Sequence, residues 1–437
     1  MSAAAPLGAP GEPTVLVESS RALPVVSMTI AERNGALEDP PGKEGLARLT
    51  KRLARRTGGG RTAEAIDLRI DSLGGALAVD VGHSTVAFHG TVIARSLDAF
   101  AELLLDVVAR PGLDAEELGK LRRETVAELV EARDHDRELG QKWFRRALFS
   151  DHPYGRTVAG TEATLAAIGP ADVAAHHLRT AVRGNLVVAF AGDVDEPRAR
   201  EIAARLSAAV PAGTARKDGL PEPTMPPGRR LLFVDKPERT QTQILIGGLG
   251  THPHDPDHTA LHVGSTVLGG TFTARLMQEI RAKRGWSYGA YANLPYDRHR
   301  RGFSLWTFPK ASDAAPCVAL ELEMLERWVA EGITPRELAW AKRYLVRSHA
   351  FAVDTAGKRV AQRLDEVLYG LPEGYHSRYI EDVRALTLDQ VNAAIRARIS
   401  PEDLLVTVVG TASEVEAGIR AAIPRLSSSE TVRYDAE

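Results

Sequence analysis

Residues 185–190 read NLVVAF, and residues 403–408 read DLLVTV, 218 positions later. Each run is short, continuous and apolar, which is typical of a strand that is buried on both faces. Three further pairs of short segments recur at offsets of 218 or 220 positions: 113–118 with 333–338, 148–149 with 368–369, and 167–173 with 385–391. Because four matches share nearly one offset, the sequence predicts an internal duplication, with one fold written twice in the chain.

The two halves repeat the same order of expected elements. Each opens with a strand and a helix, continues with two strands and two long helices, and closes with the apolar run. In the first half we expect strands at 23–32, 76–81 and 85–92, a helix beginning after Gly45, and helices at 96–108 and 114–134. In the second half we expect strands at 241–248, 288–294 and 302–308, a helix beginning after Asp257, and helices at 316–331 and 335–351.

This element order predicts the fold class. Asp114 and Thr334 each stand just before a long helix and are expected N-caps, which supports the placement of those helices. Strands and helices that follow one another in this way favour an α+β fold. We therefore expect two homologous lobes, each a mainly antiparallel sheet with helices packed on one side.

Residues 211–230, PAGTARKDGLPEPTMPPGRR, interrupt the apolar periodicity with closely spaced prolines and glycines. Such a composition is typical of a linker between domains. We therefore expect a flexible N-terminus at 1–15, an N-terminal lobe at 16–210, a C-terminal lobe at 231–430 and a C-terminal tail at 431–437.

Composition argues against several classes of protein. The 437 residues include 55 Lys and Arg against 57 Asp and Glu, a balance unlike that of a nucleic-acid-binding protein. The single cysteine, Cys317, cannot build an intrachain disulfide framework or a thiolate cage, so any metal ligands would be His, Asp or Glu. No run approaches the about 18 apolar residues of a membrane span. The N-terminal residues lack the features of a secretory signal, which predicts a cytoplasmic protein, or a periplasmic one if a signal has been removed.

A glycine-rich motif in the second half resembles a known family. Residues 268–291, LGGTFTARLMQEIRAKRGWSYGAY, contain a glycine pair, an Arg-Leu pair, an Ile-Arg pair and a tyrosine seven positions after that arginine. With DHPYG at 151–155, this pattern resembles the insulinase, or pitrilysin, family, in the smaller branch that includes mitochondrial processing peptidase and bacterial two-lobed subunits. The resemblance covers nearly the whole chain after about residue 15, and the duplication agrees with it.

The resemblance implies a metal site that this chain has lost. Members of the family are zinc peptidases in which an inverted His-x-x-Glu-His motif supplies two zinc ligands and the base, and a distal glutamate completes the coordination. The matching positions here are Arg48, Lys51 and Arg52, and the distal position is Glu128. A guanidinium has no lone pair to donate and stays protonated, so we expect no zinc in this chain. For Glu128 we expect a solvated or arginine-paired carboxylate.

The resemblance also implies a division of labour between subunits. In bacterial heterodimers of the family, one subunit carries the zinc site, and its partner contributes an arginine and a tyrosine of the second-lobe motif. Those two match Arg281 and Tyr288, which are the candidate catalytic and substrate-binding residues, with Gly269 and Gly270 as further substrate-binding positions. A guanidinium and a phenol both donate hydrogen bonds to peptide carbonyls and to a developing oxyanion. The structural alternatives are an arginine that caps its helix and a tyrosine buried in a strand.

Together these observations predict a zinc-free subunit of a heterodimeric zinc endopeptidase. Alone it would be inactive, and it would bind an extended peptide beside a homologous partner that supplies the zinc. The alternative is a structural or interaction protein of the same fold without a role in proteolysis. A third possibility is a stand-alone peptidase that uses the histidines at 252–262, where His258 and His262 have i, i+4 spacing. Because no glutamate base lies between those two, a surface histidine loop with adventitious metal affinity is the expectation there.

Overall fold

The computed structural model describes residues 11–216 and 219–437, so most of the segment 1–15, expected to be flexible, lies outside the described residues. The chain folds into two compact units, and neither is continuous in sequence. Unit 1 is made of the described residues within Met1–Leu129, Thr157–Leu220 and Ala350–Ser377. Unit 2 is made of Val130–Arg156, Pro221–His349 and Arg378–Glu437. Each unit therefore takes one segment from the other half of the chain.

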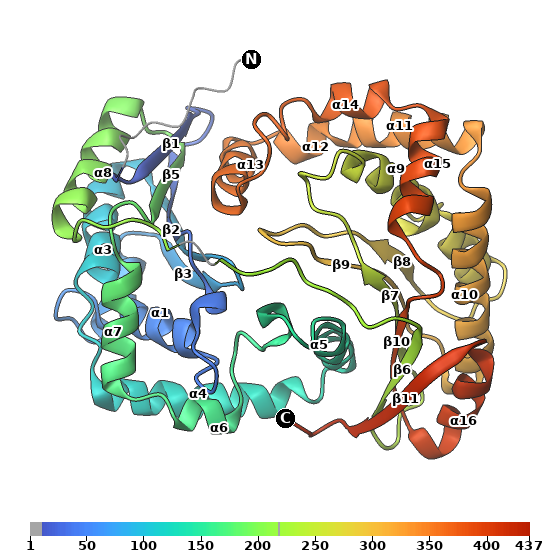
Figure 1. The fold of residues 1–437 in the computed structure, drawn as a ribbon. Helices are drawn as coiled ribbons and strands as arrows, with labels where there is room; N and C mark the ends of the chain where they lie inside the picture. Colours follow the sequence, from blue (N-terminus) through green and yellow to red (C-terminus); the bar gives the residue numbers. More distant parts are fainter. Residues whose placement is uncertain (1–10, 217–218) are drawn as a thin grey trace. The chain divides into compact units, whose positions relative to one another are not determined.

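Unit 1 is built on a five-stranded sheet with the order β1-β5-β2-β4-β3 (Figure 1). Its strands are β1 (Thr14–Ser19), β2 (Val25–Glu32), β3 (Ala76–Val81), β4 (Val86–Ile93) and β5 (Leu186–Gly192). β1 is parallel to β5, and the other neighbours are antiparallel. The helices are α1 (Leu46–Thr57), α2 (Ala63–Ser72), α3 (Leu97–Ala109), most of α4 (Ala115–Ala132), α6 (Glu162–Ala166), α7 (Pro170–Thr180), α8 (Glu196–Ala209), α12 (Ala350–Val353) and α13 (Ala356–Tyr369), with 3-10 turns at Ala36–Glu38 and Ala94–Ser96.

Helices cover both faces of this sheet. Alternate residues of β5 point to opposite faces. Val188 and Phe190 belong to the core that contains apolar residues of α3 and α8. Val187 belongs to a second cluster, with Val360 and Leu368 of α13. Because both faces are covered, the β5 sequence is a continuous apolar run instead of an alternating one.

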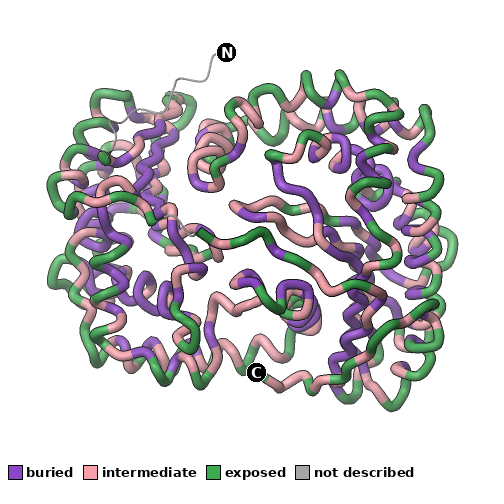
Figure 2. The backbone as a smooth tube through the Cα atoms, in the orientation of Figure 1, coloured by how far each residue is buried: buried purple, intermediate pink, exposed green. Residues whose placement is uncertain are grey.

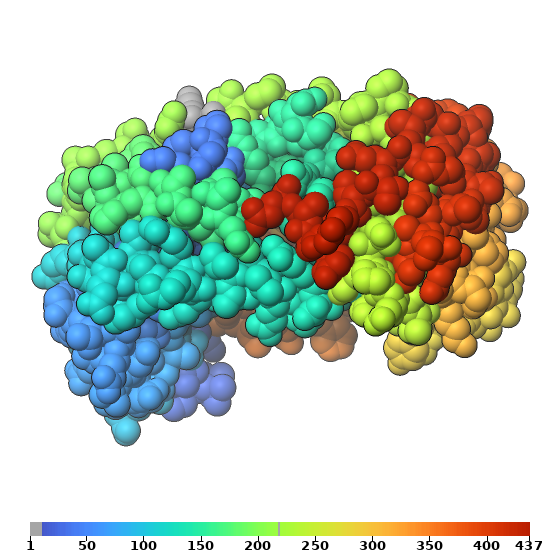
Figure 3. Space-filling model, turned by 90° about the horizontal axis from the view of Figure 1, so that it is seen from below, coloured from blue at the N-terminus to red at the C-terminus, as the bar shows by residue number. Residues whose placement is uncertain are grey.

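Unit 2 is built on a six-stranded sheet with the order β11-β6-β10-β7-β9-β8. Its strands are β6 (Arg229–Asp235), β7 (Gln243–Leu249), β8 (Ala290–Asn293), β9 (Gly302–Thr307), β10 (Leu405–Gly410) and β11 (Leu426–Arg433). β6 lies parallel between β10 and β11, and the remaining pairs are antiparallel. β11 pairs with β6, so the last strand of the chain closes one edge of the sheet. Figure 3 shows red C-terminal residues beside yellow-green ones.

Unit 2 also has helices on both faces of its sheet. They are α5 (Asp136–Leu148), α9 (His258–Gly269), α10 (Ala314–Glu331), α11 (Pro335–Ser348), α14 (Tyr379–Ala385), α15 (Leu388–Arg398) and α16 (Ala412–Ala422), with short turns at Pro153–Gly155, Met277–Ala282 and Ala311–Asp313. Residues of α9, α10, α15 and α16 share the main core with β7, β9 and β10. α5 packs on the other face, where a Cβ on Gly140 would lie 3.0 Å from Leu245 Cδ1 and 3.4 Å from Val409 Cγ2. Glycine at this position lets the helix approach the sheet closely.

The duplication predicted from the sequence explains this arrangement. Helices α5 and α13 occupy corresponding positions of the two repeats, since the matched pairs 148–149 and 368–369 lie at their C-terminal ends. Each of them belongs to the unit built mainly from the other repeat. Figure 2 shows that buried residues are concentrated along both sheets and on the helix sides that face them.

The predicted fold class is confirmed: both halves contain a sheet with mixed strands and packed helices. Both expected N-caps are present, since Asp114 Oδ1 accepts from the backbone N–H groups of Glu116 and Glu117 at 2.9 Å, and Thr334 forms a capping box with Glu337. We expected helices on one side of each sheet. In the structure α13 and α5 also cover the second side of the unit 1 and unit 2 sheets. Within the described residues, no helix is long and apolar enough to cross a membrane.

Some observed boundaries differ from the expected ranges. β6 begins inside the range 211–230 that we expected to be linker, and β11 continues to Arg433, inside the expected tail 431–437. Pairing with neighbouring strands orders both segments. β1 was not anticipated, and it depends on parallel pairing with β5, far away in sequence.

A buried ion pair joins the sheet of unit 1 to two of its helices. Lys51 Nζ of α1 lies 2.5 Å from Glu32 Oε1 of β2 and 2.7 Å from Thr180 Oγ1 of α7. The side chains of Lys51 and Glu32 are each 1% exposed. Burial lowers the pKa of Lys51, and the charge and hydrogen bond of Glu32 oppose that shift. Each charge is therefore tolerated in the core only because the other is present.

We predict that Lys51→Met lowers the free energy of unfolding by about 3–5 kcal/mol, because it leaves the Glu32 carboxylate buried without a cation. Adding Glu32→Leu to Lys51→Met is expected to recover most of that loss. The control is Lys43→Met, which breaks the partly exposed pair with Asp172 and is expected to cost about 1 kcal/mol or less. Urea unfolding followed by circular dichroism measures all four proteins, and equal losses for the two lysine variants would contradict the prediction.

A second buried carboxyl group lies in the core of unit 2. Glu321 of α10 is fully buried, and its Oε2 lies 3.2 Å from Thr307 Oγ1. Burial raises the pKa of Glu321 to about 8, although the hydrogen bonds from Thr307 and Cys317 oppose the shift. The folded protein therefore holds a proton at neutral pH that the unfolded chain releases.

We predict that this proton makes stability pH-dependent. The contribution of Glu321 is fully present below its ordinary pKa of 4.5 and is lost as the pH rises towards about 8. Between these values the free energy of unfolding should fall by up to about 1.4 kcal/mol per pH unit. Glu321→Gln should remove this slope, whereas Glu323→Gln, on the exposed side of α10, should keep it. Urea titrations from pH 5 to pH 9 test this, and an unchanged slope in Glu321→Gln would contradict it.

Candidate functional site

Helices α1 and α4 bring together three residues of the degenerate metal motif. Arg52 engages both oxygens of the Glu128 carboxylate, at 2.8 and 2.7 Å, and Arg48 donates to the same carboxylate at 2.9 Å. The i, i+4 spacing places both arginines on the side of α1 that meets Glu128. Burial raises the pKa of Glu128, but the hydrogen bonds and charges of Arg52 and Arg48 outweigh it and hold the pKa below its ordinary value.

These residues do not fit a zinc ion. The arginines have no lone pair to offer, and Glu128, the one possible ligand among them, is already bound through both oxygens. Across residues 11–216 and 219–437, no three His, Cys, Asp or Glu side chains are grouped so that they could hold a metal ion. The site that the family resemblance implies is thus occupied by an ion-pair cluster.

Lys51, which stands at the position of the family's catalytic glutamate, does not join that cluster. Its ammonium group is buried against Glu32 and Thr180. A general base needs access to water, and this side chain is 1% exposed. The three cations predicted to replace the metal site therefore divide into two arginines around Glu128 and one lysine in the core.

Unit 2 brings Arg281 and Tyr288 into contact. The guanidinium carbon of Arg281 lies 4.1 Å from the centre of the Tyr288 ring. Tyr288 is 73% exposed and precedes β8, so it is not a buried strand residue. Arg281 is half-buried and lies in the last turn of the segment Met277–Ala282. The alternative of a tyrosine buried in a strand therefore does not describe Tyr288.

The hydrogen-bond donors of this pair are uncommitted. Within the described parts of the chain, neither the Arg281 guanidinium nor the Tyr288 hydroxyl makes a hydrogen bond or an ion pair. Two nearby arginines, unlike Arg281, are paired with carboxylates. Arg275 binds Glu337 through two nitrogens at 2.7 Å, and Arg284 lies 2.7 Å from a Glu279 oxygen. Donors without a protein partner on a half-buried guanidinium and an exposed phenol are available to a ligand with carbonyl or carboxylate oxygens.

The backbone that carries Arg281 has an unusual form. Residues Met277–Ala282 make a π-helical turn, a form that is rare and often found at functional sites. The backbone N–H of Lys283 donates to the Gln278 carbonyl, five residues earlier, at 3.0 Å. Met277 and Ile280 are buried and anchor this turn to the core. The widened turn fixes the direction in which Arg281 leaves the backbone.

Gly269 and Gly270 have a structural explanation. A Cβ on Gly269 would lie 2.4 Å from the backbone nitrogen of Ala292 in β8, and one on Gly270 would lie 2.6 Å from Thr266 Cα. Only glycine fits such distances. The pair lets the end of α9 pack directly against the edge strand, which sets the position of the following loop.

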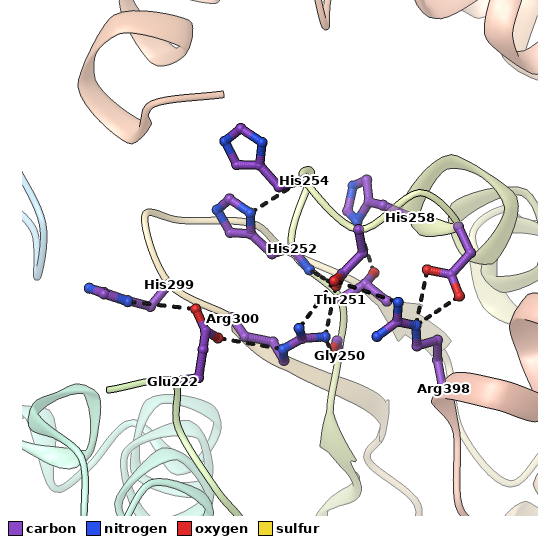
Figure 4. Close-up of polar contacts among 11 residues, drawn as sticks. Glu222, Gly250, Thr251, His252, His254, His258, His299, Arg300 and Arg398 are labelled. Carbon is purple, nitrogen blue, oxygen red and sulfur yellow. Dashed lines mark hydrogen bonds and ion pairs between the residues drawn. The ribbon is translucent and has the colours of Figure 1, made fainter. Parts of the chain in front are cut away.

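The histidines at 252–262 have separate partners. His258 Nδ1 lies 2.8 Å from Thr251 Oγ1, and His262 Nε2 lies 3.2 Å from the Tyr379 hydroxyl. The rings of His252 and His254 stack on each other with centres 5.1 Å apart. Figure 4 shows this pair of rings separate from His258 within a network of hydrogen bonds and ion pairs. The helical spacing of His258 and His262 therefore does not create a shared metal site.

Sequence reasoning missed one residue of the Arg281 site. Phe272 follows the glycine pair, is 63% exposed, and its ring centre lies 4.5 Å from the Arg281 guanidinium carbon. The only sequence feature that could have indicated Phe272 is that an aromatic residue stands in a glycine-rich turn, outside any apolar periodicity. That signal does not reveal a partner, because the contact forms only when the turn folds back on the next helical segment.

Comparisons with known proteins agree with this architecture. Residues 14–162 match the family model for insulinase (peptidase family M16), and residues 167–345 match that for the peptidase M16 inactive domain. The crystal structure of a peptidase M16 inactive domain from Pseudomonas fluorescens superposes with a TM-score of 0.86 at 25% identity, over 93% of this chain and 97% of that one. A protease structure from Helicobacter pylori shares the fold, with a TM-score of 0.81 at 16% identity, over 93% of this chain and 99% of that one.

Two relatives in sequence carry contrasting names. An uncharacterized zinc protease of Mycobacterium leprae is 28% identical over 398 residues, 88% of this chain and 86% of its own length. The non-peptidase homolog YmxG of Helicobacter pylori is 22% identical over 404 residues, 90% of this chain and 91% of its own length. The two family models and the shared fold lead to one conclusion: the chain belongs to the insulinase family, peptidase family M16.

Proposed function

We propose that this protein is the zinc-free subunit of a heterodimeric M16 endopeptidase. It binds an extended peptide and presents Arg281 and Tyr288 to the peptide backbone, while a homologous partner with an intact motif supplies the zinc and the base. The observation that carries the proposal is the contact between the half-buried Arg281 and the exposed Tyr288, whose side-chain donors have no partner among the described residues. The arginine cluster at Glu128 supports it, because that cluster removes the metal chemistry from this chain.

The two donors suit a peptide carbonyl. A charged guanidinium forms stronger hydrogen bonds than a neutral donor, and its planar N–H groups reach a carbonyl oxygen or an oxyanion without deprotonation. The Tyr288 hydroxyl adds a neutral donor beside it. Fixed donors of this kind stabilise the negative charge that develops on a carbonyl oxygen during hydrolysis.

The edge of the unit 2 sheet supports binding of an extended peptide. β8 is the last strand in the order β11-β6-β10-β7-β9-β8, so within the part of the chain that the structure describes, no strand pairs with its outer side. Tyr288 lies two residues before β8 begins. A peptide that added along this edge would pass Tyr288, with main-chain hydrogen bonds that demand little sequence specificity.

The names of the relatives fit the proposal. A family that contains both proteins named zinc proteases and a protein named a non-peptidase homolog has room for subunits with and without the metal. The M16 fold favours a homologous partner over an unrelated one. The proposal is the same for a cytoplasmic or a periplasmic complex, since the donors at Arg281 and Tyr288 keep their chemistry in both.

We predict that the purified chain neither takes up stoichiometric zinc nor cleaves peptides, because its metal helix carries arginines. Adding the zinc-bearing homologous subunit from the same host should give cleavage that a chelator abolishes. Metal content by mass spectrometry and hydrolysis of a quenched fluorescent peptide library measure both. Chelator-sensitive cleavage by the chain alone would overturn the proposal.

We predict that Arg281→Ala lowers kcat/KM of the two-subunit enzyme by about 10- to 100-fold, the loss typical of one charged hydrogen bond. Tyr288→Phe, which keeps the ring against Arg281 and removes only the hydroxyl, should lower it by about 2- to 10-fold. Arg284→Ala is the matched control, because that arginine lies in the same segment but is paired with Glu279. If Arg281→Ala and Arg284→Ala behave alike, the alternative of a structural subunit without a role in proteolysis takes the place of this proposal.

A further inference from the structure

We propose that Phe272 is a positioning residue for Arg281: its ring, together with that of Tyr288, holds the guanidinium so that its N–H groups stay directed to a ligand. The inference rests on the proposed function for the identity of that ligand, but the contact itself belongs to this chain. The two ring centres lie 4.5 and 4.1 Å from the guanidinium carbon, both within the range of cation–π attraction.

The rings of Phe272 and Tyr288 contribute little to the apolar core of the protein. Phe272 and Tyr288 are 63% and 73% exposed, so burial of their apolar surface contributes little to stability. Both nevertheless contact the same cation. Because both exposed rings contact one guanidinium, we infer that their role is to position Arg281.

The turn that carries Phe272 is fixed in place. Gly269 packs against the β8 backbone and Gly270 against α9, as their near-contacts with Ala292 and Thr266 show. The backbone N–H of Ala274 donates to the Thr271 carbonyl at 3.1 Å, which closes the turn around Phe272. The ring is therefore presented from a rigid support, as a positioning group requires.

The benefit of such positioning is entropic. A free arginine side chain has several rotatable bonds, and ordering it when a ligand binds costs conformational entropy. Aromatic rings attract the flat face of a guanidinium and leave its in-plane N–H groups available for hydrogen bonds. Among the described residues no carboxylate pairs with Arg281, whereas Glu337 pairs with Arg275. The rings therefore order this side chain without using its donors.

The first test uses the isolated chain and does not depend on a partner. NMR of the Arg281 side-chain Nε–Hε group reports both the shift caused by the nearby rings and the mobility of the guanidinium. Phe272→Leu should reduce the ring-induced shift and increase the mobility, whereas Phe272→Tyr should restore both. Phe351→Leu, which changes a phenylalanine that is 72% exposed in unit 1, should alter neither. An Arg281 signal that is unchanged in a folded Phe272→Leu variant overturns the proposal.

The second test asks whether Phe272 acts through Arg281. In the two-subunit enzyme, Phe272→Leu should lower kcat/KM by about two- to fivefold, the factor expected for an exposed cation–π contact. Phe272→Tyr should recover activity to within twofold. In an Arg281→Ala background, Phe272→Leu should have no further effect, because the group that it positions is gone. An equal loss in both backgrounds would show that Phe272 contacts the peptide directly, and would overturn its role as a positioning residue.

The two tests separate the failure of this inference from the failure of the proposed function. If Arg281→Ala leaves the activity of the two-subunit enzyme unchanged, the proposed function fails, and the NMR measurement still decides whether Phe272 orders Arg281. If Arg281→Ala lowers activity and Phe272→Leu changes neither the NMR signal nor kcat/KM, the proposed function stands and the role of Phe272 is overturned. Thermal unfolding of every variant shows that the comparison is between folded proteins.

Discussion

Two guanidinium groups share one carboxylate where members of this family bind zinc. Arg52 and Arg48 surround Glu128 and use both of its oxygens, so α1 and α4 are joined by ion pairs that need no metal. The group is partly exposed, which makes its contribution to stability modest. Its larger consequence is chemical: at these positions the helix offers no lone-pair donor, so it cannot hold the zinc ion that would activate water.

The arginines of this protein show how environment decides the use of one side chain. At Glu128 the guanidinium groups are held by a carboxylate, Arg52 through both of its terminal nitrogens and Arg48 through one. At Arg281 the guanidinium is held by the rings of Phe272 and Tyr288, which attract the cation but accept no conventional hydrogen bond. An arginine of the first kind joins two helices, whereas the donors of the second kind have no partner among the described residues.

The duplicated architecture has a physical consequence for both sheets. A strand buried on two faces needs apolar cover on each, and the helices of its own repeat supply only one layer. Helix α5 of the first repeat covers the second face of the unit 2 sheet, where Gly140 permits close packing. Helix α13 of the second repeat does the same in unit 1 through Val360 and Leu368. This exchange makes each unit discontinuous in sequence.

The sequence by itself determined the duplication, the apolar central strands, the N-caps at Asp114 and Thr334, and the loss of metal ligands at Arg48 and Arg52. All of these depend on local pattern or on the intrinsic chemistry of one side chain. Only the tertiary structure decided that Lys51 is buried against Glu32, that α5 and α13 exchange between units, and that Phe272 lies against Arg281. Those features are contacts between segments brought together by folding, and a one-dimensional pattern does not specify which distant residue a side chain will meet.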